Sequence, residues 1–234
     1  MMHLRPFRPG DWHGIELVTF DIDGTLYDQR MLRLRMSRDM LLHTLRRFDL
    51  GVLAVVLNYR RLRERLGNEE THAFEPRLVA CTAAATARTE DQIRAIVAEW
   101  IEDRPLAYLA DCRYRGVAEL FAGLRRHGKI VGVLSDYPAP TKLAAMGLTA
   151  DFVASATDEE VAVLKPHPRG LEWLMQRAAV SPAATLMIGD RVERDGLAAQ
   201  RAGTRCLIRS SRARRGWQTF AGFNDPLFAP MLSD

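Results

Sequence analysis

Two aspartates, Asp21 and Asp23, follow an apolar segment near the start of the 234-residue chain. Residues two apart on an extended chain point to the same side, so both carboxylates can face one site. One could attack an electrophilic phosphorus, while the other protonates the leaving oxygen and later activates water. Gly24 permits a sharp turn, and Thr25 offers a hydroxyl and a backbone N–H to phosphate oxygens. A simple turn explains an isolated Asp-Gly-Thr sequence equally well.

Four further polar residues suit phosphoryl chemistry. Ser135 follows an apolar run, where its hydroxyl could hold a phosphate oxygen or cap the next helix. Lys165 precedes a proline, which favours extended backbone, and its ammonium could neutralise a phosphate beside an attacking carboxylate. Asp190 and Asp195 could join Asp21 around Mg²⁺, which prefers carboxylate oxygens, water and substrate phosphate. A surface lysine and a helix N-cap are the alternative interpretations of Lys165 and Asp195.

These residues lie at or just after the ends of expected β-strands. Apolar runs, helical spacing and Gly or Pro punctuation predict strands over 15–20, 130–134, 152–156, 184–188 and 205–209, and helices over 117–126, 141–146, 171–179 and 197–202. Such alternation requires a parallel sheet with helices on both faces. Ligands bind outside the carboxyl ends of the strands in open α/β sheets, so we expect one site there.

The alternation is interrupted between residues 29 and 113, where helical spacing dominates, for example over 31–47 and 89–101. We interpret residues 29–113 as a mainly helical cap, and residues 1–28 and 114–234 as an α/β core. The tail from Ser210 is loop-rich and first basic, then aromatic. We expect its aromatic side chains to pack on the core rather than on bases; they are Trp217, Phe220, Phe223 and Phe228.

Composition excludes several classes of protein. The chain is 47% hydrophobic and 26% charged, which is ordinary for a globular protein. Three cysteines are too few for a disulfide framework or zinc site, which favours a reducing cytoplasm. The longest apolar run, 50–57, is short of the ~20 residues that a membrane helix needs. The net charge of +4 permits anionic partners, but a solvated basic surface is favoured over nucleic-acid binding.

Together the motifs resemble those of the haloacid dehalogenase superfamily, over residues 15–28 and 115–209 and in the usual order. They are Asp21-x-Asp23-Gly-Thr25, Ser135, Lys165-Pro and Gly189-Asp190-x4-Asp195. The resemblance implies a Rossmann-like parallel sheet with a helical cap inserted after the first motif. It departs from the family at Arg194, where a small polar residue is frequent, and at Asp136, where Asn is frequent.

The resemblance also implies roles for these residues and a magnesium-dependent phosphatase acting through an aspartyl-phosphate. Asp21 would be the nucleophile and Asp23 the general acid/base. Thr25 and Ser135 would bind phosphate, and Lys165 would stabilise charge and bind phosphate as well. Mg²⁺ would be bound by Asp190 and Asp195, together with Asp21 and the backbone carbonyl of Asp23. The implied partner is a small phosphorylated substrate.

Other functions are weighed against particular residues. Asp23 argues against the halide-releasing members, which usually lack it, and the absence of lysine from 29–113 argues against the phosphonate-cleaving members, which need a cap lysine. A phosphomutase uses the same two aspartates and is the alternative. A non-catalytic module that binds an anion or nucleic acid through the arginine-rich cap is less favoured. Three cap residues are candidates to bind a second anionic group of the substrate: Arg30, Arg33 and Arg35. The sequence leaves the oligomeric state open.

Overall fold

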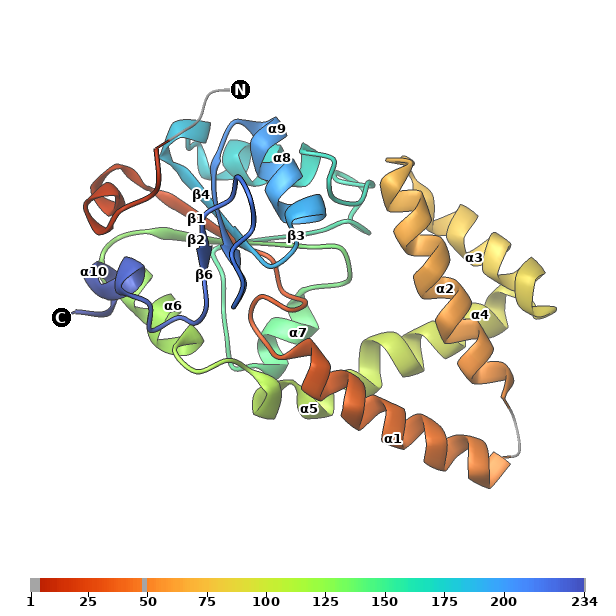
Figure 1. Cartoon of the computed structure of the whole chain (residues 1–234). Helices are drawn as coiled ribbons and strands as arrows, with labels where there is room; N and C mark the ends of the chain where they lie inside the picture. Colours follow the sequence, from red (N-terminus) through yellow and green to blue (C-terminus); the bar gives the residue numbers. More distant parts are fainter. Residues whose placement is uncertain (1–4, 48–49, 234) are drawn as a thin grey trace.

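The computed structural model describes residues 5–47 and 50–233, and its centre is a six-stranded parallel sheet (Figure 1). The strand order is β3-β2-β1-β4-β5-β6. The strands are β1 (Leu17–Phe20), β2 (Ile130–Ser135), β3 (Phe152–Ser155), β4 (Thr185–Gly189), β5 (Arg205–Arg209) and β6 (Thr219–Phe220). All four residues of β1 are buried, as expected for a central strand covered on both faces. The predicted α/β fold with a parallel sheet is confirmed.

Helices cover both faces of the sheet. Val18 and Phe20 of β1 belong to an apolar cluster that includes side chains of α6 (Val117–Arg126), whereas Leu17 packs in a cluster with α8 (Arg169–Ala178) and α9 (Leu197–Ala202). This division follows the period of two along a strand. In Figure 1, α6 lies on one side of the sheet and α8 and α9 on the other.

The carboxyl-terminal tail contains a strand that the sequence did not predict. Thr219–Phe220 pairs parallel with β5, so the expectation that 205–209 forms the last strand is wrong. Two residues are too few to show an alternating pattern, which explains the omission. The expected packing of the tail aromatics is confirmed for Phe220, Phe223 and Phe228, which are buried and in mutual contact. Trp217 is half-buried.

Two predicted boundaries differ for physical reasons. The first strand begins at Leu17 rather than Ile15, because 9–14 forms a 3₁₀ helix for which Ile15 is the C-cap. The helix expected over 89–101 is divided: α4 (Glu90–Val97) is followed by a π-helical segment, η2 (Ala98–Asp103). Pro105 follows, and its missing N–H interrupts the regular helical hydrogen bonds at this point.

The segment after β1 consists of helices beside the sheet (Figure 1). They are α1 (Gln29–Arg47), α2 (Gly51–Asn68), α3 (Phe74–Thr86), α4, η2 and α5 (Arg104–Cys112). An apolar cluster within this segment includes Val55, Phe74 and Trp100. We retain the division into a core and a cap over 29–113 as our interpretation. Within the described ranges, no helix combines the length and apolarity that a membrane crossing requires.

Candidate active site

The carboxyl ends of β1, β2 and β4 bring the predicted chemical residues to one edge of the sheet. Phe20 of β1 lies opposite Val133 of β2 and Ile188 of β4, so the residues that follow these strands are neighbours. Asp21 and Asp190 come directly after β1 and β4. Parallel register, rather than proximity in sequence, therefore assembles the site.

Three carboxylates converge on one lysine. Asp21, Asp190 and Asp195 each place a carboxylate oxygen within 4.8 Å of the others. Lys165 Nζ donates to Asp21 Oδ1 at 2.5 Å and to Asp195 Oδ1 at 2.7 Å. Burial disfavours its charge, but attraction to Asp195 and Asp21 outweighs this and raises the pKa of Lys165 well above its usual value. One ammonium among three carboxylates leaves an excess of negative charge when all three are ionised.

The local pKa values reflect this excess. Burial, reinforced by neighbouring carboxylates and opposed by Lys165, raises the pKa of Asp21 well above its usual value. Burial, followed by repulsion from Asp195, raises the pKa of Asp190 to about 7. Asp190 Oδ1 is buried and has no hydrogen-bond partner in the described structure. A divalent cation would neutralise the excess charge and bind this oxygen. The all-oxygen donor set therefore fits Mg²⁺.

Asp23 lies in a different electrostatic environment from Asp21. Lys142 Nζ donates to its two carboxylate oxygens at 2.6 and 2.8 Å, and the Tyr27 hydroxyl also donates to it. Burial alone would raise the pKa of Asp23, but Lys142 and then Tyr27 outweigh burial and lower it. The two aspartates of the first motif therefore have opposite pKa shifts.

Lys142, which was not predicted from the sequence, lies in α7 (Pro140–Ala145) and is buried against the site. No motif marks this residue, because its partner Asp23 is 119 positions away. A weak compositional signal was present: only three of the 33 basic residues are lysines, and two of them, Lys142 and Lys165, form ion pairs with Asp23 and Asp21.

The two predicted phosphate-binding hydroxyls are buried and engaged. Thr25 Oγ1 donates to Asp21 Oδ2 at 2.8 Å, which orients the carboxylate. Ser135 Oγ accepts from the backbone N–H of Tyr137 at 3.1 Å. Neither hydroxyl is among the described groups that line the adjoining cavity. Their role as phosphate ligands stays a prediction.

The two departures from the family pattern have structural explanations. Asp136 Oδ1 accepts the backbone N–H of Lys165 at 3.0 Å, so this carboxylate positions the lysine. Arg194 is buried and donates to the Lys165 carbonyl at 2.5 Å, to the Glu64 carbonyl at 2.9 Å and to the Asn68 side chain at 3.0 Å. An arginine at this position therefore ties helix α2 to the π-helical segment η4 (Val192–Gly196), which carries Asp195.

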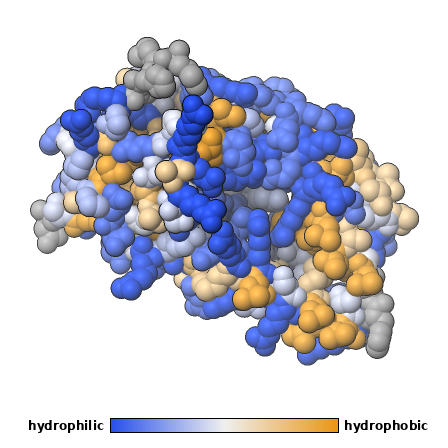
Figure 2. All heavy atoms as spheres, in the orientation of Figure 1, coloured by the Kyte–Doolittle hydropathy of each residue, from blue (hydrophilic) through white to orange (hydrophobic). Residues whose placement is uncertain are grey.

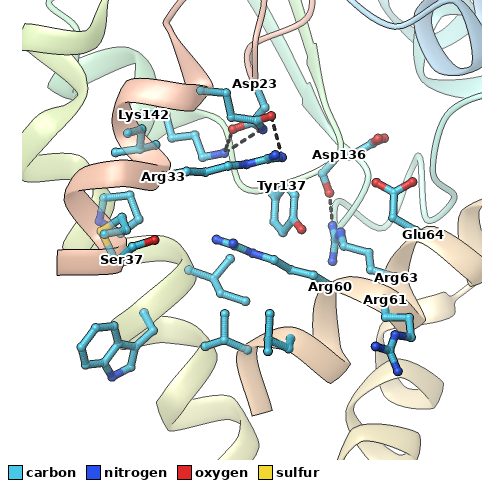
Figure 3. A pocket seen from close by; sticks show the side chains of 18 of the residues that line it. Asp23, Arg33, Ser37, Arg60, Arg61, Arg63, Glu64, Asp136, Tyr137 and Lys142 are labelled. Atoms are coloured by element: carbon cyan, nitrogen blue, oxygen red, sulfur yellow. Dashed lines mark hydrogen bonds and ion pairs between the residues drawn. The ribbon is translucent and has the colours of Figure 1, made fainter. Parts of the chain in front are cut away.

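A cavity of about 910 Å³ opens between the carboxylates and helices α1 and α2. Of the three arginines proposed from the sequence, only Arg33 is among its described lining residues. Arg35 instead pairs with Asp111 at 2.7 Å, so the proposal is wrong for Arg35, and Arg30 also lies outside the lining. The sequence missed Arg60, which enters from α2 opposite Arg33 (Figure 3).

The cationic side chains of the wall differ in their freedom. Arg63 is held in place, because it donates to the Asp136 carbonyl and lies 4.1 Å from the Tyr137 ring centroid. Within the described ranges, Arg60 has no hydrogen-bond or ion-pair partner and is exposed. Within the same ranges, Arg61 also lines the cavity, is exposed and has no such partner, so both arginines are free to meet an anionic group there.

A family model for the haloacid dehalogenase-like hydrolases matches residues 15–203. The match spans the sheet edge with Asp21, Lys165, Asp190 and Asp195, and the whole helical segment from α1 to α5. The chain therefore belongs to this family of hydrolases.

The names of similar proteins narrow the class of hydrolase. The chain is 26% identical over 194 residues to a phosphoglycolate phosphatase of Vibrio vulnificus strain YJ016, covering 81% of each chain. It is 28% identical to phosphoglycolate phosphatase 1 of Pseudomonas aeruginosa over 81% of this chain and 67% of the relative. It is also 28% identical over 208 residues to a glyceraldehyde 3-phosphate phosphatase of Methanopyrus kandleri, covering 86% and 85%. With the family match, these relatives identify an enzyme of the phosphatase class.

Solved structures show the same fold. A HAD-hydrolase, YfnB from Bacillus subtilis, superposes with a TM-score of 0.65 at 14% identity and covers 92% of this chain and 98% of that chain. CbbY from Rhodobacter sphaeroides, solved in complex with phosphate, superposes with a TM-score of 0.59 at 21% identity. The match covers 90% of this chain and 96% of that chain. At these identities the likeness concerns the arrangement of sheet and helices.

Proposed function

We propose that the protein hydrolyses a small-molecule phosphate monoester in a magnesium-dependent reaction that passes through a phosphorylated Asp21. The observation that carries the proposal is the contact of Lys165 with both Asp21 and Asp195, next to the unpartnered oxygen of Asp190. Mg²⁺ held by Asp21, Asp190 and Asp195, with the Asp23 carbonyl, would polarise the phosphoryl group and shield charge.

In the first half-reaction, an Asp21 oxygen attacks phosphorus and the bond to the alcohol oxygen breaks. Lys165 neutralises charge on the attacking carboxylate and the transferring phosphate, because its ammonium already contacts Asp21. Thr25 holds the other oxygen of the nucleophile through its 2.8 Å hydrogen bond. The leaving alcohol takes a proton from Asp23.

In the second half-reaction, water attacks the phosphorus of the aspartyl-phosphate. Asp23 accepts a proton from this water, and the bond between Asp21 and phosphorus breaks to regenerate the carboxylate. Lys142 favours the anionic form of Asp23, which suits this water-activating step and opposes the earlier protonation of the alcohol.

The substrate is proposed to be small, because the cavity beside Asp21 is of the size that encloses a small molecule. Phosphoglycolate and glyceraldehyde 3-phosphate, named for the relatives, belong in the first panel. We also propose a cytoplasmic location, which is supported by the three free thiols.

The test measures phosphate release from phosphoglycolate, glyceraldehyde 3-phosphate, sugar phosphates and p-nitrophenyl phosphate, with and without Mg²⁺. We expect release that needs the metal and is abolished by Asp21→Asn. Asp91→Asn is the matched control, because Asp91 has a 99% exposed side chain outside the cavity and should retain activity. If folded protein releases phosphate from no ester, the proposal is wrong, and interconversion of sugar phosphates would then support the phosphomutase.

A further inference from the structure

The cavity beside Asp21 has two apolar walls that face each other. Leu32, Met36 and Met40 recur every four residues along α1, so they share one face of that helix. Leu53 and Leu57 share a face of α2 in the same way. All five line the cavity. These side chains therefore form an apolar surface next to the nucleophile, although Met36 and Met40 also pack against the apolar cluster of the cap.

The lining changes in character with distance from the carboxylates. On α1, Arg33 lies near the core end of the helix and Thr44 near the far end, so the lined face extends about 16 Å at about 1.5 Å per residue. On α2, Arg60 lies toward the core end, and Leu53 and Leu57 lie farther away. A molecule that reaches from Asp21 outward between the two helices thus meets Arg33 and Arg60 before Met40, Leu53 and Leu57.

Part of this apolar lining is exposed to water. Leu41, Leu50 and Leu57 are 59%, 67% and 54% exposed, and all three line the cavity. Figure 2 shows hydrophobic residues gathered over the cap at the lower right, where α1 and α2 lie in Figure 1. Apolar surface in contact with water is unfavourable, and an apolar ligand that displaced this water would bind more tightly.

We infer, building on the proposed phosphatase function, that the substrate is a phosphate monoester of an amphiphilic alcohol with a substantial alkyl or aryl body. Its phosphate lies at Asp21, and its apolar body lies between α1 and α2 against Met40, Leu53 and Leu57. A two-carbon hydroxy acid phosphate reaches only the charged floor and the arginines. It leaves most of the 910 Å³ cavity, and its leucines, in contact with water.

The hydrolysis experiment compares kcat/KM for ethyl, butyl, hexyl and octyl phosphate, each below its micelle concentration, with p-nitrophenyl phosphate as the general phosphatase reference. We expect kcat/KM to rise about two- to fourfold per added methylene, since full burial of one methylene corresponds to about a fourfold gain. Leu57→Asn should lower the ratio of octyl to ethyl by about threefold or more. Leu34→Asn is the matched control, because Leu34 is 73% exposed and outside the described lining, and it should leave the ratio unchanged.

A binding experiment separates this inference from the proposed function. Alkylphosphonates of the same chain lengths lack the scissile P–O–C link, so calorimetry with Mg²⁺ measures their affinity without turnover. Affinity that rises with chain length and falls in Leu57→Asn, but not in Leu34→Asn, supports the inference even if no ester is hydrolysed. Hydrolysis of p-nitrophenyl phosphate with alkylphosphonate affinity that is flat or falls with chain length overturns the inference and leaves the phosphatase intact.

Discussion

Replacing Gly67 by alanine tests whether helix α2 is coupled through Arg194 to the segment η4, which carries Asp195. A Cβ added at Gly67 would lie 3.0 Å from Arg194 Cζ, 3.1 Å from Nη2 and closer still to Nη1. The Arg194 side chain is only 4% exposed and is held by Lys165 and Glu64, so it has little room to move. The methyl group must therefore displace Arg194 or push α2 away from the core.

The magnitude follows from competing contributions. Alanine in place of a helical glycine stabilises by about 1 kcal/mol. Overpacking a filled site costs about 1–3 kcal/mol, and losing one charge-assisted hydrogen bond of Arg194 costs about 1.5–3 kcal/mol. The net loss of unfolding free energy is therefore on the order of 1.5–5 kcal/mol. A shift of the segment η4, which carries Asp195, would also lower kcat/KM by roughly 10–100-fold.

The assay is urea unfolding together with kcat/KM for p-nitrophenyl phosphate. Ala54→Gly, at an exposed position of the same helix, measures the intrinsic effect of glycine in α2 and should leave activity unchanged. If Gly67→Ala is more stable than wild type by about 1 kcal/mol and fully active, helix propensity decides the result and the coupling through Arg194 is wrong.

Three further predictions concern charge and close packing. Lys142→Met removes the ammonium that outweighs burial and lowers the pKa of Asp23, so this pKa should rise. Because the first half-reaction needs Asp23 protonated, the high-pH limb of the kcat/KM profile for an alkyl phosphate should move to higher pH, and an unmoved limb would contradict the assignment. Gly24→Ala should weaken Mg²⁺ binding measured by calorimetry, because its φ is +100° and a Cβ would lie 2.9 Å from Asp190 Cγ; unchanged affinity would show that the turn adapts. Hydrogen bonding, chiefly to Arg191, lowers the pKa of Glu64 to about 2. The stability that the ionised Glu64 adds to the folded state is therefore complete above its unfolded pKa of about 4.5 and is lost as the pH falls through about 2. Glu64→Gln should remove at most about 1 kcal/mol of this pH-dependent stability in acid unfolding, since the carboxylate is half exposed, and an identical pH profile would argue against the ion pairs.

Most strands and helices of the core could be predicted from the sequence, because the patterns that indicate them lie within each segment. Central strands such as 185–189 are continuous apolar runs, and helix 197–202 ends at a glycine that adopts a positive φ of +75°. The two-residue strand β6 has no such signal, since it forms only through pairing with β5. The π-helical segment at 98–103 likewise depends on its position before Pro105 rather than on a periodic pattern.

The site residues likewise divide into those with a local sequence signal and those without one. Asp21, Lys165 and Asp195 were placed together because each follows an expected strand, and the structure joins them through one ammonium. Lys142 and Arg60 come from helices whose sequences carry no motif, and only the folded chain brings them to the cavity. The apolar faces of α1 and α2 were visible as helical spacing, but spacing does not distinguish a core face from a ligand-binding face.

Phosphorylation of Asp21 is the central claim, and rapid acid quenching followed by peptide mass mapping tests it most directly. The Asp23→Asn variant with p-nitrophenyl phosphate is the best material, because this leaving group needs no protonation while the water-activating step is slowed. We predict a mass increase of one phosphoryl group, located by fragmentation at Asp21, which requires Mg²⁺ and is absent when Asp21→Asn is added. Phosphorylation at another residue, or turnover by Asp21→Asn at the wild-type rate, would contradict the account.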